Sequence, residues 1–247
     1  MRRTVQGIVL REINYKEADK ILTVLTREEG KLTLKARGCR RKNSRLLASS
    51  QLLVYSELAI TQRGEFITLA EGDPLTQFRR LGEDIDKLAL ASYFAEVTEK
   101  TVQEGEVCPD ILSLLLNCLY ALSKLDLPES QVKAVFELRA ACLSGYTPDL
   151  TGCHVCGSQT PERFDLSAGM LECRNCRSPE SNGIRMPVPP SVLEAMRYIC
   201  YCDSKKLFSF QAGEDTLQQL SEVTEAYLAT QLERGFSTLD FYKSLLI

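Results

Sequence analysis

The chain has 247 residues, of which 44% are hydrophobic and 26% charged, a composition typical of a globular protein with one or two domains. Its formal charge of −3 averages two different parts: residues 1–80 hold 16 Lys and Arg against 9 Asp and Glu, whereas residues 81–247 hold 14 against 24. This split argues against a generic small-molecule enzyme. It favours a protein that binds a polyanion with one part and other molecules with the rest.

Neither a membrane span nor a signal peptide is indicated. The longest apolar stretches, such as residues 111–122, are too short and too interrupted to cross a bilayer. The first residues carry cations but lack an apolar h-region and a cleavage site. We therefore expect a cytoplasmic protein, whose thiols stay reduced and whose ten cysteines need a role other than disulfide formation.

The first 80 residues predict a small β-barrel. Runs of apolar and β-branched residues are separated by turn signals and show no helical period. Five strands of this kind are typical of an OB-fold. The predicted strands are residues 4–12, 20–26, 31–37, 52–61 and 66–71, with a polar connection over 14–19 and a hairpin turn over 62–65.

The third predicted strand alternates apolar and polar residues and leads into a basic segment. Leu32, Leu34 and Ala36 are predicted to point one way, and Lys35 and Arg37 the other. No acidic residue occurs from position 30 to 56, and OB-folds bind single strands across this region. A solvated charge run is the alternative. The candidate nucleic-acid contacts are Lys35, Arg37, Arg40, Arg41, Lys42 and Arg45.

Aromatic residues for base stacking are few in this part of the chain. It has no Trp, and its aromatics are Tyr15, Tyr55, Phe66 and Phe78, most of which suit a core equally well. We therefore expect electrostatic binding that tolerates many sequences.

The remainder predicts an all-α domain over residues 81–247 after the barrel domain over 1–80. In the first helix, Ile85, Leu88, Ser92 and Ala95 recur at helical spacing. In the third, Val132, Val135, Phe136 and Leu143 suggest a buried face. The predicted helices are residues 83–103, 109–124, 128 to about 145, 191–203, 214–234 and 238–246, interrupted by an insertion at about 150–185.

Four cysteines in that insertion have the spacing of a zinc site. Cys153, Cys156, Cys173 and Cys176 form C-x2-C-x16-C-x2-C. Two short turns, each presenting two thiolates, complete a tetrahedron and leave no position for a catalytic water. We expect one structural Zn²⁺ in a zinc-ribbon-like unit, with a hairpin over 163–172 and His154 facing solvent. Four reduced core cysteines are the alternative.

Catalytic motifs are absent from the sequence. The acidic residues Glu83, Asp84 and Asp86 fall in the first turn of a predicted helix, where they favourably meet its dipole. We predict no enzyme activity. Two alternatives stay open: a metal-dependent nuclease that the OB-fold delivers to DNA, and a zinc-ribbon regulator that grips DNA with Arg163, Arg174 and Arg177.

Several runs in the chain resemble the RecO family of bacterial recombination mediators. They are GIVLRE at 7–12, ADKILTVLT at 18–26, GKLTLKARGCRR at 30–41, FELR at 136–139 and LSGYTP at 143–148, together with both cysteine pairs. Their order and spacing carry the resemblance over nearly the whole chain.

The resemblance implies a non-enzymatic protein of DNA repair and recombination, associated with the nucleoid. Such proteins bind single- and double-stranded DNA, anneal complementary strands, bind the C-terminal tail of SSB, and with RecR promote loading of RecA. Carried onto this sequence, the DNA contacts are the six basic residues named above, with Arg2, Arg3 and Arg11 as further candidates, and the zinc ligands are the four cysteines. Lys133 and Arg139 are candidates for a cation that meets the SSB tail.

Overall fold

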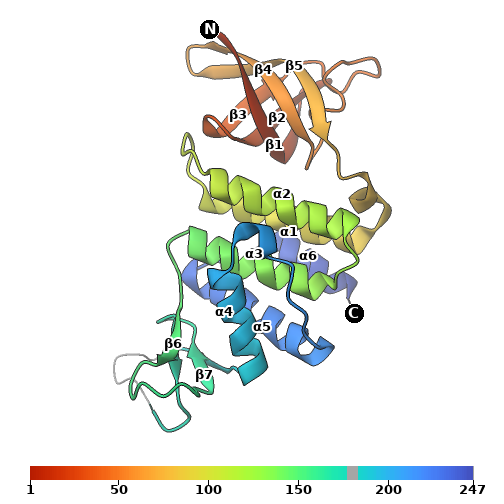
Figure 1. Ribbon diagram of the computed structural model, residues 1–247. Helices are drawn as coiled ribbons and strands as arrows, with labels where there is room; N and C mark the ends of the chain where they lie inside the picture. Colours follow the sequence, from red (N-terminus) through yellow and green to blue (C-terminus); the bar gives the residue numbers. More distant parts are fainter. Residues whose placement is uncertain (177–182, 247) are drawn as a thin grey trace. The chain divides into compact units, whose positions relative to one another are not determined.

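The chain forms two compact units in the computed structural model, which describes residues 1–176 and 183–246 (Figure 1). Unit 1 comprises Met1–Lys124 and Phe236–Ile247, and unit 2 comprises Leu125–Gly235. Unit 1 is therefore built from two segments that are far apart in sequence. None of the helices in the described part of the chain combines the length and the apolar character needed to span a bilayer.

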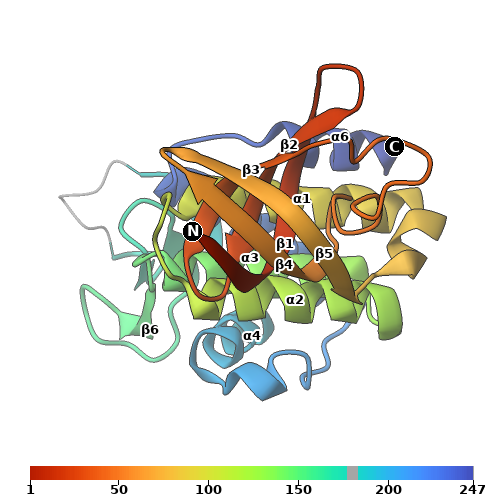
Figure 2. The ribbon, with the colours of Figure 1, turned by 90° about the horizontal axis from the view of Figure 1, so that it is seen from above.

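A closed five-stranded barrel forms the first part of unit 1, as predicted (Figure 2). Its strands are β1 (Arg2–Tyr15), β2 (Asp19–Thr26), β3 (Gly30–Ala36), β4 (Tyr55–Arg63) and β5 (Phe66–Thr76). They follow the order β1-β2-β3-β5-β4, and β3 and β5 pair in parallel while the other pairs are antiparallel. This is the OB-fold expected from the sequence.

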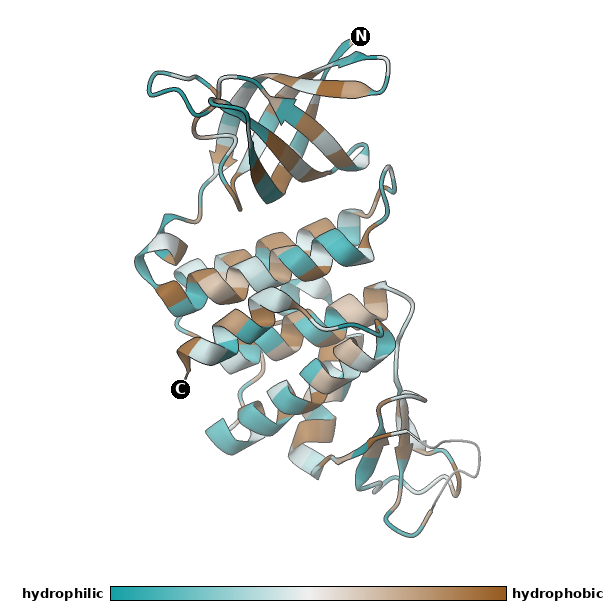
Figure 3. Cartoon of the chain, turned by 180° about the vertical axis from the view of Figure 1, so that it is seen from behind, coloured by the Kyte–Doolittle hydropathy of each residue, from teal (hydrophilic) through white to brown (hydrophobic). Residues whose placement is uncertain are grey.

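Alternation of apolar and polar residues builds the barrel core. Leu32, Leu34 and Ala36 are buried, whereas Thr33 and Arg37 are exposed, so the predicted facing of the third strand is confirmed. Figure 3 shows hydrophobic and hydrophilic bands along the barrel strands. Each Leu or Ile fully buried here contributes about 1.5–3 kcal/mol to stability.

Strands β4 and β5 continue beyond their predicted ends, to Arg63 and Thr76, and two further differences have a clear cause. The predicted connection over 14–19 belongs largely to the β1–β2 ladder, in which Asn14 pairs with Lys20 and Tyr15 with Asp19. Backbone pairing does not require apolar side chains, so the polar sequence concealed it. Residues 52–54 are not in a strand, because Leu53 adopts a positive φ of 61° in a turn.

Helices α1 (Ile85–Thr101), α2 (Pro109–Lys124) and α6 (Ser237–Leu245) complete unit 1, after a 3-10 turn, η1 (Arg79–Glu83). Helix α1 packs against β1, α2 and α6, and the ring centroids of Tyr93 on α1 and Phe236 before α6 lie 5.5 Å apart. The residues whose spacing predicted α1 do not all mark its buried face, because Ile85 and Leu88 are 60% and 38% exposed. A helix covered on several sides is apolar around most of its surface, which blurs its period.

Helices α3 (Glu129–Leu143), α4 (Pro190–Tyr201) and α5 (Glu214–Gln231) form the helical core of unit 2, with a short 3-10 turn, η2 (Ser204–Lys206). All three pack against one another. Val132, Val135 and Phe136 are buried as predicted, but Leu143 at the end of α3 is 37% exposed.

A small sheet interrupts these helices. Strands β7 (Arg163–Asp165) and β8 (Met170–Glu172) form the predicted hairpin, and β6 (Asp149–Cys153) and β9 (Arg185–Pro187), which were not predicted, extend it in the order β6-β8-β7-β9. The division of the chain into a barrel domain over 1–80 and a helical domain over 81–247, with an insertion at 150–185, remains a prediction.

Candidate nucleic-acid interface and metal centre

Residues 37–45, hereafter the basic loop, leave the barrel at the end of β3. Its five basic side chains, Arg37, Arg40, Arg41, Lys42 and Arg45, are all exposed. Within the part of the chain that the structure describes, none of the five forms an ion pair. Their charges therefore remain available to an external anion.

The backbone of the basic loop is fixed to the β1–β2 turn. The Gly38 N–H donates to Asp19 Oδ1 at 2.8 Å, and the Arg40 N–H donates to the Ala18 carbonyl at 3.0 Å. Between these two bonds the Cys39 side chain is completely buried in the barrel core. Gly38 has a φ of 63°, which suits glycine at this exit from the strand. The hydrogen bond from Gly38, followed by the nearby Lys35, lowers the pKa of Asp19, so this anchor is ionised at neutral pH.

Lys35 differs from the other predicted contacts. Its ammonium lies 3.5 Å from an Asp19 carboxylate oxygen and 4.6 Å from the ring centroid of Tyr15, and its side chain is 25% exposed. An aspartate already offsets part of its charge, so Lys35 is less free than the residues of the basic loop.

Two residues beside the basic loop were not predicted from the sequence. Tyr15 is 42% exposed, and the exposed Lys16 has its ammonium 5.6 Å from the Tyr15 ring centroid. Both lie at the β1–β2 turn, which the hydrogen bonds above join to the loop. The proximity of Tyr15 and Lys16 to the basic loop follows only from the strand pairing, because more than 20 residues separate them from the loop in sequence. Of the other aromatics, Phe66 is 79% exposed and Tyr55 and Phe78 are half-buried, so none of the four is in the core.

The further candidates at the start of the chain lie in ion pairs on the barrel. Arg2 contacts Glu71 at 2.7 Å and Arg11 contacts Glu99 at 3.4 Å. Both nitrogens of the Arg3 fork contact the Glu29 carboxylate. The carboxylates already compensate these charges, which distinguishes the three arginines from the basic loop.

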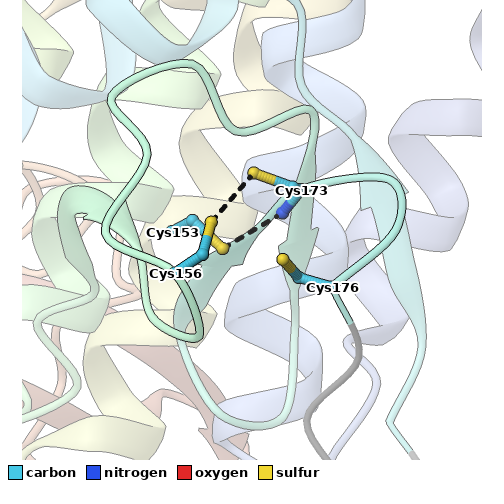
Figure 4. A group of neighbouring side chains, drawn as sticks. All are labelled: Cys153, Cys156, Cys173 and Cys176. Carbon is cyan, nitrogen blue, oxygen red and sulfur yellow. Dashed lines mark hydrogen bonds between the residues drawn. The ribbon is translucent and has the colours of Figure 1, made fainter.

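The four predicted metal ligands come together in unit 2 (Figure 4). Cys153 ends β6 and Cys156 lies in the turn that follows it, whereas Cys173 and Cys176 follow β8. All four sulfurs lie within 4.8 Å of one another, and the Cys156 and Cys173 sulfurs are 3.7 Å apart. Sulfurs bound to one zinc ion at about 2.3 Å stand about 3.8 Å from each other. The donor set therefore fits a tetrahedral metal ion.

Backbone groups favour the ionised form of one ligand. The Cys173 N–H donates to Cys153 Sγ at 3.3 Å. Burial acts to raise the pKa of Cys153, but the backbone N–H groups of Cys156, Cys173 and Val155 lower it to about 6. His154 is exposed, as predicted, and the cysteine cluster is the only set of three or more metal-ligating side chains found among residues 1–176 and 183–246.

Two of the other predicted charges, Asp84 and Arg139, form internal hydrogen bonds. Asp84 caps α1 by accepting hydrogen bonds from the backbone N–H groups of Asp86 and Lys87. Arg139 donates to the carbonyls of Cys200 and Cys202 at 2.6 and 3.3 Å. Lys133 is only 4% exposed, so its suggested role as a cation for an external peptide is wrong. Of the arginines suggested for a DNA-gripping ribbon, Arg174 is exposed, and Arg177 lies outside the described residues.

Comparison with known proteins covers nearly the whole chain. The family model described as Recombination protein O N terminal matches residues 1–78, and that described as Recombination protein O C terminal matches residues 82–240. The DNA repair protein RecO of Acetivibrio thermocellus is 33% identical over 97% of this chain and 95% of its own length. The proteins of that name from Caldicellulosiruptor saccharolyticus and Bacillus subtilis are 32% and 30% identical, over 96% and 90% of this chain and 96% and 86% of their own lengths.

Proposed function

Because the chain belongs to the RecO family of DNA repair proteins, we propose that it is a non-enzymatic recombination mediator that binds DNA through the basic loop. The observation that carries this proposal is the set of five exposed arginine and lysine side chains, without ion pairs in the described structure, on one loop of an OB-fold barrel. Lys35 adds a sixth, partly compensated charge. Single-stranded DNA is the substrate that this arrangement suits best.

Binding of this kind is electrostatic and tolerates many sequences. Each phosphate neutralised on a single strand contributes about 0.7 to the slope of log K against log salt, so six contacts predict a slope of about −4. Few aromatic residues lie beside the basic loop, with Tyr15 the exposed one at the adjoining turn. A protein that holds strands by their phosphates leaves base edges free to pair. This supports annealing of complementary single strands, and the same phosphate contacts allow binding to double-stranded DNA.

The cysteine cluster serves a structural role in this proposal. Four thiolates fill the coordination sphere of one Zn²⁺ and leave no place for an activated water. The ion would hold the turns after β6 and β8 together, and with them the sheet of unit 2.

Protein partners complete the proposed function. We assign to the acidic part of the chain, residues 81–247, the contacts with RecR and with the C-terminal tail of SSB, and indirectly the loading of RecA. Negative charge there disfavours DNA and directs it to the barrel. The protein would act in the cytoplasm, at the nucleoid.

A salt titration of single-strand binding tests the basic loop. The variant Arg40→Ala/Arg41→Ala/Lys42→Ala removes three of the five free charges. We expect its salt slope to fall by about 2 and its affinity at low salt to fall about tenfold or more. The matched control, Lys205→Ala/Lys206→Ala/Arg234→Ala, removes three exposed charges from unit 2 and should keep the wild-type slope.

Two further arms separate the alternatives. If Arg174→Ala/Arg177→Ala weakens binding more than the loop variant does, the ribbon and not the barrel grips DNA. Labelled DNA incubated with the protein and Mg²⁺ should be annealed and left intact. Strand cleavage by the pure protein would instead identify it as a nuclease.

A further inference from the structure

Two cysteines outside the metal cluster face each other in unit 2. Cys142 lies in the last turn of α3 and Cys200 in the last turn of α4, two helices that pack together. Their sulfurs are 3.8 Å apart, within hydrogen-bonding distance. A disulfide needs about 2.05 Å, so the sulfurs must approach by about 1.7 Å.

The two thiols have different environments. Cys142 is partly exposed at the end of its helix, whereas Cys200 is 7% exposed. Arg139 lies one turn before Cys142 on α3, and its guanidinium is fixed beside both residues by its hydrogen bonds to the carbonyls of Cys200 and Cys202. A partly exposed cysteine next to a held cation and a second thiol is in the setting in which cysteines react with oxidants.

Burial distinguishes an attacking thiol from a resolving one. Arg139 places a positive charge close to the partly exposed Cys142, which favours its thiolate. Burial disfavours ionisation of Cys200 and raises its pKa. Cys118, by contrast, is fully buried, and burial alone raises its pKa.

We propose that Cys142 and Cys200 form a redox-active pair that hydroperoxides convert to a disulfide. The Cys142 thiolate attacks the peroxide, whose O–O bond breaks to give a sulfenic acid and an alcohol or water. The Cys200 sulfur then attacks the sulfenic sulfur, the S–O bond breaks, and the hydroxide leaves as water with the Cys200 proton. Two electrons pass from the two thiols to the peroxide.

This disulfide would join the end of α3 to the end of α4. The segment between Cys142 and Cys200 contains the sheet β6 to β9 and all four residues of the cysteine cluster. Oxidation would therefore close a covalent loop that contains the ribbon and α4. The inference depends neither on DNA binding nor on the identity of the metal.

Peptide mapping of the full chain tests the proposal. The reduced, zinc-supplemented protein is exposed to increasing hydrogen peroxide, quenched with iodoacetamide, digested and analysed by mass spectrometry. We expect a cross-linked Cys142–Cys200 peptide that dithiothreitol releases. We also expect Cys142 to be consumed at least about tenfold faster than Cys118.

Single variants identify the order of events. In Cys200→Ala the sulfenic acid on Cys142 should persist and be trapped by dimedone, whereas Cys142→Ala should give no adduct on Cys200. Cys118→Ala is the control and should still form the cross-link. The wild-type map alone is decisive if a variant does not fold. Two outcomes at peroxide doses that oxidise the remaining thiols would overturn the proposal. One is recovery of both Cys142 and Cys200 as alkylated thiols, and the other is a disulfide between Cys142 and any other cysteine.

Discussion

At the scale of single residues, the charge of Lys133 is neutralised by ion pairs inside the protein. Its ammonium lies 2.9 Å from a Glu137 oxygen and 2.8 Å from a Glu225 oxygen, between α3 and α5. Glu137 is fully buried and also accepts a hydrogen bond from Thr224 at 2.8 Å. The desolvation cost of these charges is offset only while the partners remain together.

Replacing Lys133 should therefore destabilise the protein strongly. Lys133→Met leaves the buried Glu137 without its cation, and we expect the free energy of unfolding to fall by about 3–5 kcal/mol in urea titrations followed by circular dichroism. Lys133→Met/Glu137→Gln should recover part of the loss, and the exposed Lys205→Met should change little. A loss below about 1 kcal/mol for the single variant would show that water reaches this pair.

How far single residues can be predicted depends on how local their signal is. The clustering of the four cysteines could be predicted because each pair is contained in one short segment and the spacing alone indicates a metal site. The burial of Lys133 results from packing against α5, some 90 residues away, and its helical neighbours give no sign of it. Tyr15 and Lys16 were missed for the same reason, because strand pairing places them beside the basic loop.

At the scale of elements, two polar contacts fix α1 within unit 1. At its C-terminal end, the Lys31 ammonium donates to the Glu99 carbonyl at 2.6 Å and also to the Val102 carbonyl, where a cation is favoured by the helix dipole. Nearer its middle, Glu96 accepts the Thr238 N–H at 3.0 Å and so caps the first turn of α6. The barrel and α6 are thus both tied to the same helix.

The Glu96 contact predicts a dependence of stability on pH. Burial acts to raise the pKa of Glu96, but the hydrogen bonds from Thr238 outweigh it and leave the pKa below its ordinary value of 4.5. A carboxyl whose pKa is lower in the folded state stabilises the protein above pH 4.5, and this contribution is lost as the pH falls through the folded value.

Glu96→Gln should therefore cost about 0.5–1 kcal/mol at pH 7 and progressively less below about pH 4. Urea unfolding of wild type and variant across this range measures the difference. The exposed Glu104→Gln serves as control and should follow the wild-type curve. A constant difference between the Glu96 variant and wild type at every pH would show that the effect is steric.

The facing of residues was easiest to predict where one side of an element meets solvent. The alternation in β3 is clear because one side of the barrel wall is polar. Helix α1 itself was predicted, but its buried surface is wider than one stripe, because Ala89, Ala91, Ala95 and Thr98 are buried as well as the larger Leu90, Tyr93, Phe94 and Val97. Strands β6 and β9 are short and pair only within the ribbon, and their sequences carry no alternation long enough to detect.

At the scale of the whole molecule, the two units should respond differently to metal removal. The proposed zinc site lies in unit 2, whereas the barrel core is formed within unit 1. A strong chelator should remove hydrogen-exchange protection from β6 and β8 and leave β1 to β5 protected. Binding of the metal ion stabilises only the segment whose cysteines hold it, so its removal should unfold that segment alone.

Cys153→Ser should remove hydrogen-exchange protection from β6 and β8 even when no chelator is added. Cys118→Ala, which alters a buried cysteine outside the cluster, should leave this protection unchanged. Equal loss of protection in the barrel would mean that the units unfold as one.

The division into units was beyond prediction from local pattern. The change from strands to helices near residue 80 is visible in composition, and it marks a change of fold type. The assignment of residues 85–124 to the same unit as the barrel depends on contacts of α1 with β1 and of α6 with α1. The hydrophobic periodicity of α6 does not show that this helix packs against elements more than 100 residues earlier in the sequence.

The return of the chain to unit 1 at α6 also sets an order of maturation during synthesis. The barrel and α1 leave the ribosome first, but the surface of α1 around Tyr93 that receives Phe236 stays uncovered until unit 2 has been translated. At about 5–20 residues per second, that interval lasts about 5–20 s. During it, the nascent protein exposes an apolar helix face to chaperones and to neighbouring chains, so the unit translated first is the last to be complete.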